Sequence, residues 1–264
     1  MSATWLWVLY AGLVGLCVGS FLNVLIYRVP RGLPWAVSRS RCPSCGQPIA
    51  AWDNIPLLSY LILLGRCRTC RERISVRYPL VEALTAALFV ACLLRFGLSL
   101  ASVAAAVFCL LSVALAFIDA EHYLLPDVLT LPGVLLGLAA SSWVPWTEFS
   151  WRPALLGAVL GGGLLWAIYG AWLLLRKEEG MGLGDAKMLA MQGAFLGWKN
   201  MLLTLLVAAV LGSVVGVVVM RSRSEGWKTR LPFGTFLAAA GVFALFFGPS
   251  IVAWYSGFLS RPSP

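Results

Sequence analysis

Charged residues are scarce in this sequence, and several common catalytic motifs are absent. Asp, Glu, Lys and Arg make up only 12% of the 264 residues, hydrophobic residues make up 60%, and the mean hydropathy is +0.87. This composition excludes a soluble globular domain. G-x-S-x-G and H-E-x-x-H motifs are missing, which removes the usual signatures of serine hydrolases and zinc proteases. His122 is the only histidine, so a histidine-based metal site is excluded as well.

Long uncharged runs are abundant instead. A run of about 20 apolar residues crosses the roughly 30 Å hydrocarbon core of a bilayer as a helix. Six clear candidates are 2–27, 97–118, 128–147, 153–175, 200–220 and 231–260. Two weaker candidates are 78–94, which contains Glu82, and the short run 184–198, which contains Asp185 and Lys187. The sequence therefore predicts an all-α polytopic membrane protein with about eight transmembrane helices.

The basic residues are distributed unevenly between the two sides of these predicted spans. Sixteen of the twenty Lys and Arg residues lie in the alternate segments 28–77, 176–187 and 221–230. Because loops rich in Lys and Arg remain in the cytoplasm, we expect the amino terminus outside and these segments inside. The net charge of +9 then follows from topology, and we expect its partner to be the lipid bilayer, not nucleic acid.

One sizeable polar segment, 28–77, divides the chain into three predicted domains. Residues 1–27 form the first transmembrane helix, 28–77 a small cytoplasmic domain, and 78–264 a membrane domain. Inside the polar segment, the stretch 55–65 is apolar but too short to span. We expect it to rest on the membrane or to re-enter it.

The polar segment carries two C-x2-C pairs separated by 21 residues. Paired C-x2-C motifs at such a separation present four thiolates to a tetrahedral ion, which is the arrangement that structural zinc prefers. Two disulfides are an alternative that a reducing cytoplasm disfavours. A thiol redox centre is another, although it needs only one pair. The predicted metal ligands are Cys42, Cys45, Cys67 and Cys70.

Acidic residues occur at the edges of predicted spans. A charged group inside a bilayer span costs on the order of 2.5 to 3.5 kcal/mol, so it usually has a partner or a function. Asp119 falls at the carboxyl end of a predicted helix, where the helix dipole disfavours a carboxylate. Asp127 and Asp185 each precede an apolar run, so both also fit helix N-caps. Glycines at 182 and 184 permit close approaches near Asp185.

Two carboxylates held close together cannot both ionise comfortably. One then keeps a proton while the other activates water, which is the chemistry of aspartic peptide hydrolysis. Lys187 lies two residues after Asp185, about 200° around a helix, and is badly placed to neutralise it. The two acidic segments therefore predict a paired-carboxylate site.

Short motifs between about residue 15 and residue 190 carry a family resemblance. They are Gly19-Ser20-Phe21-Leu22-Asn23-Val24, Cys42-x-x-Cys45, Asn54-Ile55-Pro56, Gly65-Arg66-Cys67-x-x-Cys70, Arg77-Tyr78-Pro79-Leu80-Val81-Glu82, Asp119, Leu125-Pro126-Asp127-x-Leu129-Thr130 and Gly182-x-Gly184-Asp185-x-Lys187. In these motifs the chain resembles the bacterial type IV prepilin leader peptidases, which belong to the G-x-G-D aspartic membrane proteases. The resemblance implies that Asp119 and Asp185 are the catalytic pair. It implies supporting roles for Asp127, Gly182, Gly184 and Lys187.

The resemblance also implies a class of substrates, a cellular location for cleavage and a second activity. The substrates would be type IV prepilins and type II secretion pseudopilins, each with a short basic leader ending in Gly, followed usually by Phe and an apolar helix. Cleavage would occur at the cytoplasmic face of the bacterial inner membrane. Many members also methylate the new amino terminus with S-adenosylmethionine. The sequence has no Rossmann fingerprint for this cofactor, so the methyltransferase prediction rests on resemblance, with Gly65 and Glu82 as candidate residues.

A non-enzymatic protein is the alternative prediction. In a zinc-ribbon membrane scaffold or a transporter, acidic residues would line a polar pathway. This alternative accounts for the cysteines and for the acidic residues separately, but not for their occurrence together in one sequence. Cleavage of a leader-bearing peptide by the purified protein distinguishes the two predictions.

Overall fold

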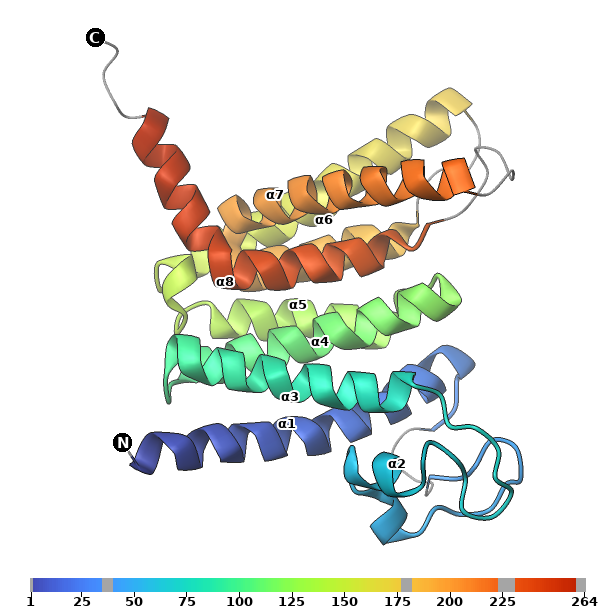
Figure 1. Cartoon of the computed structure of the whole chain (residues 1–264). Helices are drawn as coiled ribbons and strands as arrows, with labels where there is room; N and C mark the ends of the chain where they lie inside the picture. The colour runs from blue at the N-terminus through green and yellow to red at the C-terminus, as the bar shows by residue number, and fades with distance from the viewer. Residues whose placement is uncertain (1, 35–39, 177–181, 223–230, 260–264) are drawn as a thin grey trace. The chain divides into compact units, whose positions relative to one another are not determined.

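The computed structural model describes residues 2–34, 40–176, 182–222 and 231–259, and within them almost all regular structure is helical (Figure 1). Extended backbone pairs only at two isolated bridges in these residues, Arg41 with Pro48 and Arg66 with Arg73. The predicted all-α class is confirmed. The chain forms two compact units, Met1–Ala114 and Leu115–Pro264, and the boundary falls within helix α4 (Leu100–His122).

In the first unit, helices α1 (Ser2–Arg28) and α3 (Arg77–Phe96) pack along each other. Small residues allow this approach. A Cβ at Gly15 would lie 2.6 Å from Ala86 Cα, and one at Gly19 would lie 2.8 Å from Glu82 Cα. The polar segment between the two helices holds the short elements η1 (Val29–Arg31), η2 (Ala51–Asn54) and α2 (Leu58–Ile62).

The second unit contains α5 (Asp127–Ala140), η3 (Pro145–Thr147), α6 (Trp151–Arg176), α7 (Leu183–Ser222) and α8 (Phe233–Leu259). Helix α7 packs against α5, α6 and α8. Its contact with α6 is a backbone contact, because a Cβ at Gly157 or at Gly193 would collide with the backbone of the other glycine. Helix α7 therefore forms the centre of this unit.

Each of the eight predicted apolar runs contains helix, although the α-helix in 128–147 ends at Ala140. Only six helices in the described residues are long and apolar enough to cross a membrane. They are α1, α3, α4, α6, α7 and α8. Helix α5 has 14 residues and is too short to cross alone. Helix α7 is interrupted at Gly197, where φ is 75° and ψ is 164°, so the runs 184–198 and 200–220 are two helical pieces joined at a break. The protein is a multi-pass membrane protein.

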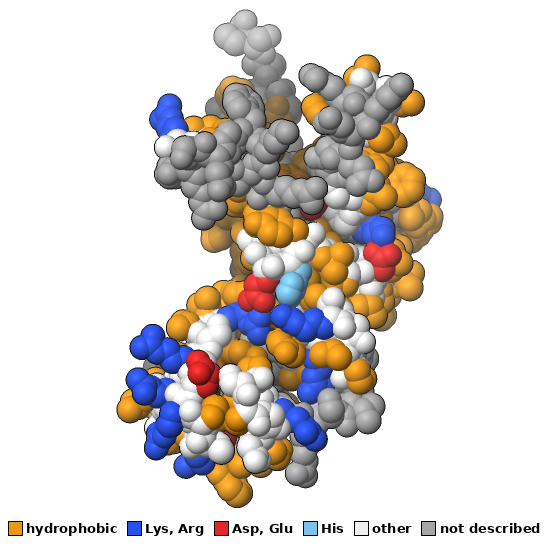
Figure 2. Space-filling model, turned by 90° about the vertical axis from the view of Figure 1, so that its right-hand side faces the viewer, with side chains coloured by type: hydrophobic (Ala, Val, Ile, Leu, Met, Phe, Trp, Pro, Cys, Tyr) orange, Lys and Arg blue, Asp and Glu red, His pale blue; other side chains and the backbone are white. Residues whose placement is uncertain are grey.

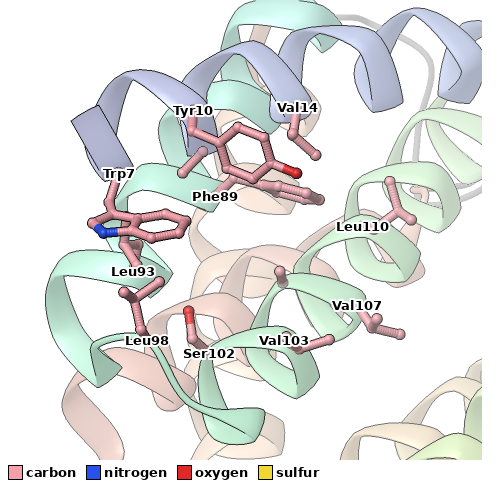
Figure 3. A pocket seen from close by; sticks show the side chains of 12 residues that line it. Trp7, Tyr10, Val14, Phe89, Leu93, Leu98, Ser102, Val103, Val107 and Leu110 are labelled. Atoms are coloured by element: carbon pink, nitrogen blue, oxygen red, sulfur yellow. The ribbon is translucent and has the colours of Figure 1, made fainter. Parts of the chain in front are cut away.

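One groove of about 320 Å³ lies in the first unit, between α1, α3 and the start of α4 (Figure 3). Apolar side chains dominate its lining, with Ser102 and the Tyr10 hydroxyl as exceptions. It contains no acidic residue and no cysteine. The groove is therefore not a candidate for acid–base or metal chemistry.

Candidate active site and metal centre

Asp119 lies in the last turns of α4 and is buried, with 5% of its surface exposed. The backbone N–H of Thr235, in the first turn of α8, donates a hydrogen bond of 2.9 Å to its Oδ2. The Thr235 hydroxyl donates to the carbonyl oxygen of Ala116 at 3.1 Å. The Asp119 carboxylate thus caps the N-terminus of a second helix, where free N–H groups and the positive end of the dipole favour an anion. This contact compensates for its unfavourable position at the carboxyl end of α4.

Asp185 is the third residue of α7 and is also buried, with 8% of its surface exposed. It interacts electrostatically with Asp119, but its side chain accepts no hydrogen bond from the residues that the structure describes. The predicted N-cap role is wrong for Asp185, because the helix begins two residues earlier at Leu183. The two carboxylates therefore differ in their surroundings, and only Asp119 is held by hydrogen-bond donors.

Leu125 packs between the start of α7, which carries Asp185, and the start of α8, which binds Asp119. It lies in the connection between α4 and α5 and is buried. A Cβ at Gly184 would lie 2.8 Å from Leu125 Cβ. A Cβ at Gly234 would lie 2.9 Å from both Leu125 Cδ1 and Asp119 Oδ2. Any residue larger than glycine at position 184 or 234 would therefore collide with Leu125.

Gly182, unlike Gly184, has room for a Cβ, so substitutions at the two glycines should differ in their effect on cleavage. The nearest atom to a Cβ at Gly182 is Asp185 Oδ2 at 3.8 Å, which is an ordinary contact. We expect Gly184→Ala to displace Leu125 and Asp185 and to reduce peptide cleavage by more than about tenfold, whereas Gly182→Ala reduces it much less. The measurement is the cleavage rate of the purified variants. Recovery of activity in the double variant Gly184→Ala/Leu125→Ala would locate the effect in this contact, and equal losses at the two glycines would contradict it.

Asp127 and Lys187 form an ion pair, with 2.6 Å between Oδ1 and Nζ. Asp127 is the first residue of α5, and its predicted N-cap role is wrong because Pro126 occupies the cap position. The pair joins the first turn of α5 to the first turn of α7 near Asp185. Lys187 thus contacts a different carboxylate from the catalytic candidate, in agreement with its predicted angular position.

The ion pair is testable by exchanging its charges. Since an exposed pair contributes only about 0.2–1 kcal/mol, we expect Asp127→Lys or Lys187→Asp to lower cleavage severalfold by placing like charges together. The double variant Asp127→Lys/Lys187→Asp should recover much of the loss. Cleavage kinetics of the three variants provide the measurement. A double variant no better than the worse single variant would show that one of these residues acts in the chemistry itself.

The four predicted metal ligands lie together at two similar turns. Their Sγ atoms all lie within 4.8 Å of one another, and the Sγ atoms of Cys42 and Cys70 are 3.8 Å apart. A tetrahedral zinc ion with Zn–S bonds of about 2.3 Å would place its sulfurs about 3.8 Å apart. Residue Gly46 after the first pair and Arg71 after the second pair both have positive φ.

The thiols at this site are free, and two of them have shifted pKa values: that of Cys67 is lowered, whereas burial and the neighbouring thiols raise the pKa of Cys70 to about 12. All four cysteines are unpaired thiols, so the disulfide alternative is not what the structure contains. The backbone N–H groups of Cys70 and Thr69 lower the pKa of the Cys67 thiol from 9.0 to about 7. A thiolate is the form that binds metals. The four cysteines could hold one metal ion.

The two candidate cofactor residues have contacts within the chain. Glu82 is buried, and its Oε2 accepts a hydrogen bond of 2.8 Å from the backbone N–H of Leu57. At Gly65, where φ is 67°, a Cβ would lie 2.9 Å from the hydroxyl oxygen of Tyr60. These contacts account for both residues structurally, and their cofactor role stays a prediction.

Sequence reasoning missed Gly234 and Thr235 at this site, and it quoted Leu125 in a family motif without giving it a role. A signal for the first two was present, because Pro232 followed by an apolar run is typical of a helix start. Nothing in the sequence connects that helix start with Asp119, which lies 116 residues earlier.

Comparison with known proteins covers both units. Residues 13–96 match the bacterial peptidase A24 N-terminal domain, and residues 106–217 match the type IV leader peptidase family. The chain is 42% identical to the prepilin leader peptidase/N-methyltransferase of Pseudomonas putida, over 92% of this chain and 91% of that protein. It is 41% identical to the protein of the same name from Aeromonas hydrophila, over 95% of this chain and 94% of that protein. No solved structure matches the chain.

Proposed function

The chain belongs to the type IV leader peptidase family, and we propose that it is a membrane aspartic endopeptidase that removes the basic leader from type IV prepilins and pseudopilins. The observation that carries this proposal is the pair of buried carboxylates, Asp119 and Asp185, on two helices of one unit. The names of the relatives support the substrate class.

The different surroundings of the two carboxylates suggest a division of roles. Asp119, which accepts the N–H of Thr235, is held in place as the base that takes a proton from the attacking water. Asp185, which has no such donor among the described residues, supplies its proton to the carbonyl oxygen. When the C–N bond breaks, Asp119 passes the proton that it took from water to the leaving amine, and the hydroxyl of the intermediate returns a proton to Asp185 as the new carboxyl group forms. The products are a leader with a free carboxyl group and a protein with a new amino terminus. Asp127, Gly182, Gly184 and Lys187 support the geometry of the pair.

The distribution of basic residues supports a cytoplasmic site in the bacterial inner membrane. Sixteen of twenty Lys and Arg residues lie in segments that share one side of the predicted spans. With the amino terminus outside, the spans α1, α3 and α4 place the end of α4 in the cytoplasm, and the start of α7 lies on the same side because Asp185 interacts with Asp119. A prepilin whose leader stays in the cytoplasm can then present its cleavage site at the membrane edge.

The metal at the cysteine site is proposed to be one structural zinc ion. Four thiolates with no further donor fit a closed tetrahedral zinc site, in which no position is left for a substrate. The ion would contribute stability to the loop between α1 and α3. It has no part in peptide hydrolysis.

The second proposed activity is methylation of the new amino terminus with S-adenosylmethionine. The names of the relatives support it. Gly65 and Glu82 are already occupied by contacts within the chain, because Tyr60 lies against the glycine and the Leu57 N–H binds the carboxylate. No step is therefore assigned to these two residues.

The test is direct cleavage by the full chain, purified in detergent with its metal content and folding verified. The substrate is a synthetic peptide with a basic leader, Gly, Phe and an apolar helix, and mass spectrometry identifies the products. We expect cleavage after the Gly, and methylation of the new terminus when S-adenosylmethionine is added. Folded wild-type protein without cleavage would favour the scaffold or transporter.

A further inference from the structure

Exposed apolar side chains gather on a short part of the cysteine-containing loop. We define the α2 segment as residues 55–64, which lie between the two cysteine pairs and include α2. Leu61 and Ile62 each have 67% of their surface exposed, and Leu64 has 83%. Such a cluster in a polar loop would be unfavourable in water, because burying apolar surface is worth about 25 cal/mol per Å². The segment therefore needs an apolar partner.

A hydrogen bond fixes the depth of this segment relative to the membrane helices. Glu82 lies five residues after Arg77, the first residue of α3, which places it about 7.5 Å along that helix. Its Oε2 accepts the backbone N–H of Leu57 at 2.8 Å. The beginning of the α2 segment therefore lies level with the second turn of a membrane-spanning helix, well inside its end.

A second contact gives the same depth from α1. The side chain of Ser20 is hydrogen bonded to Glu82, and Ser20 lies eight residues before Arg28, where α1 ends. The contact is thus about 12 Å inside the end of α1. In the view of Figure 1, α2 lies level with the last turns of α1 and not beyond them. Both helices are apolar membrane spans, so hydrocarbon is expected around them at this depth.

The backbone at the start of the α2 segment is held by a residue outside the segment. Leu57 adopts a positive φ of 58°, which costs a residue other than glycine on the order of 1–3 kcal/mol and must be held by its surroundings. No side-chain cap from the segment itself satisfies the start of α2. The Glu82 carboxylate accepts the N–H of Leu57, the residue at the cap position, which would be costly if left unpaired in hydrocarbon.

Charges on the rest of the loop complement a lipid surface. Arg41, Arg66, Arg71 and Arg73 are all exposed. Figure 2 shows blue Lys and Arg side chains, with orange hydrophobic ones between them, in the lower part of the view. Basic groups beside an inserted apolar segment attract anionic lipid headgroups, with about 1 kcal/mol for each Lys or Arg near the surface.

We propose that the α2 segment re-enters the cytoplasmic leaflet, where Leu61, Ile62 and Leu64 contact lipid acyl chains. Glu82 is the positioning residue that holds the segment at this depth by accepting the Leu57 N–H. The exposed arginines of the loop face the anionic headgroups. This assignment is independent of peptide cleavage, since it concerns only the first unit.

The experiment uses the full chain in nanodiscs of phosphatidylethanolamine and phosphatidylglycerol. The photoreactive residue benzoylphenylalanine replaces Leu61 or Leu64, and in a control it replaces Ser44, which is exposed in the first cysteine pair. After irradiation, mass spectrometry measures lipid adducts. We expect several-fold more lipid adduct at 61 and 64 than at 44. Equal adducts at all three positions, or adducts with protein in place of lipid, would overturn the proposal.

The role of Glu82 is tested in the same system with a matched pair of variants. Glu82→Gln keeps an oxygen that accepts the Leu57 N–H, whereas Glu82→Ala removes it. We expect Glu82→Gln to retain the lipid adducts at 64 and Glu82→Ala to lose most of them, with metal content preserved in both. Hydrogen exchange at residues 57–62 should increase only in Glu82→Ala. Unchanged adducts and exchange in Glu82→Ala would refute the positioning role.

Discussion

Asp119→Asn and Asp185→Asn should each reduce leader cleavage by a factor of about 10² to 10⁴, the range expected when general acid–base catalysis is lost. Asparagine has nearly the same shape as aspartate, and at position 119 its oxygen can still accept the Thr235 N–H. It can neither take a proton from water nor supply one. The cleavage rate of a leader-bearing peptide by purified, inserted variants measures the effect.

Asp127→Asn is the matched control for these two variants. Asp127 is exposed and contacts Lys187, so the amide removes one ion pair without changing a buried carboxylate. We expect its cleavage rate to fall by less than about tenfold. Near wild-type activity in Asp119→Asn or Asp185→Asn would disprove the catalytic pair. A loss in Asp127→Asn as large as in Asp185→Asn would place Asp127 in the chemistry.

We expect wild-type protein to hold about one zinc ion per chain, and Cys42→Ser or Cys67→Ser should remove it. Serine is a poor zinc ligand, and a structural zinc site contributes an apparent 10–16 kcal/mol, much of which appears as folding free energy of the segment that it joins. The loop around the cysteines should therefore become sensitive to proteases and exchange its amides rapidly. Elemental analysis and hydrogen exchange are the measurements.

The cysteine variants should also separate the two proposed activities. The proposed catalytic residues Asp119 and Asp185 lie in the other compact unit, so cleavage should persist in part, while methylation should suffer more. Cys17→Ser is the control, because Cys17 is exposed on α1 and outside the cluster. It should keep the metal. Freshly purified, reduced wild-type protein without zinc, or a Cys42→Ser protein with full metal content, would be incompatible with the proposed site.

The sequence by itself determined the features that depend on residues close together in the chain. Apolar runs predicted all six membrane-length helices. Two runs predicted as separate spans differ in the structure: 128–147 forms the short helix α5, and 184–198 is the first piece of α7. Two C-x2-C pairs predicted the cysteine cluster, because each pair is brought together by one local turn. The acidic residues Asp119 and Asp185 were identified in the same way, since a carboxylate in an apolar run is conspicuous.

Only the tertiary structure decided which helix ends meet. Asp119 binds the first turn of α8, 116 residues later, and Leu57 binds Glu82 on α3. Asp127, predicted as a helix cap, instead pairs with Lys187. The physical reason is that apolar helices in a membrane offer many similar faces to one another. Backbone contacts at glycines and a few buried hydrogen bonds select among these faces, and both kinds of contact join residues far apart in the chain.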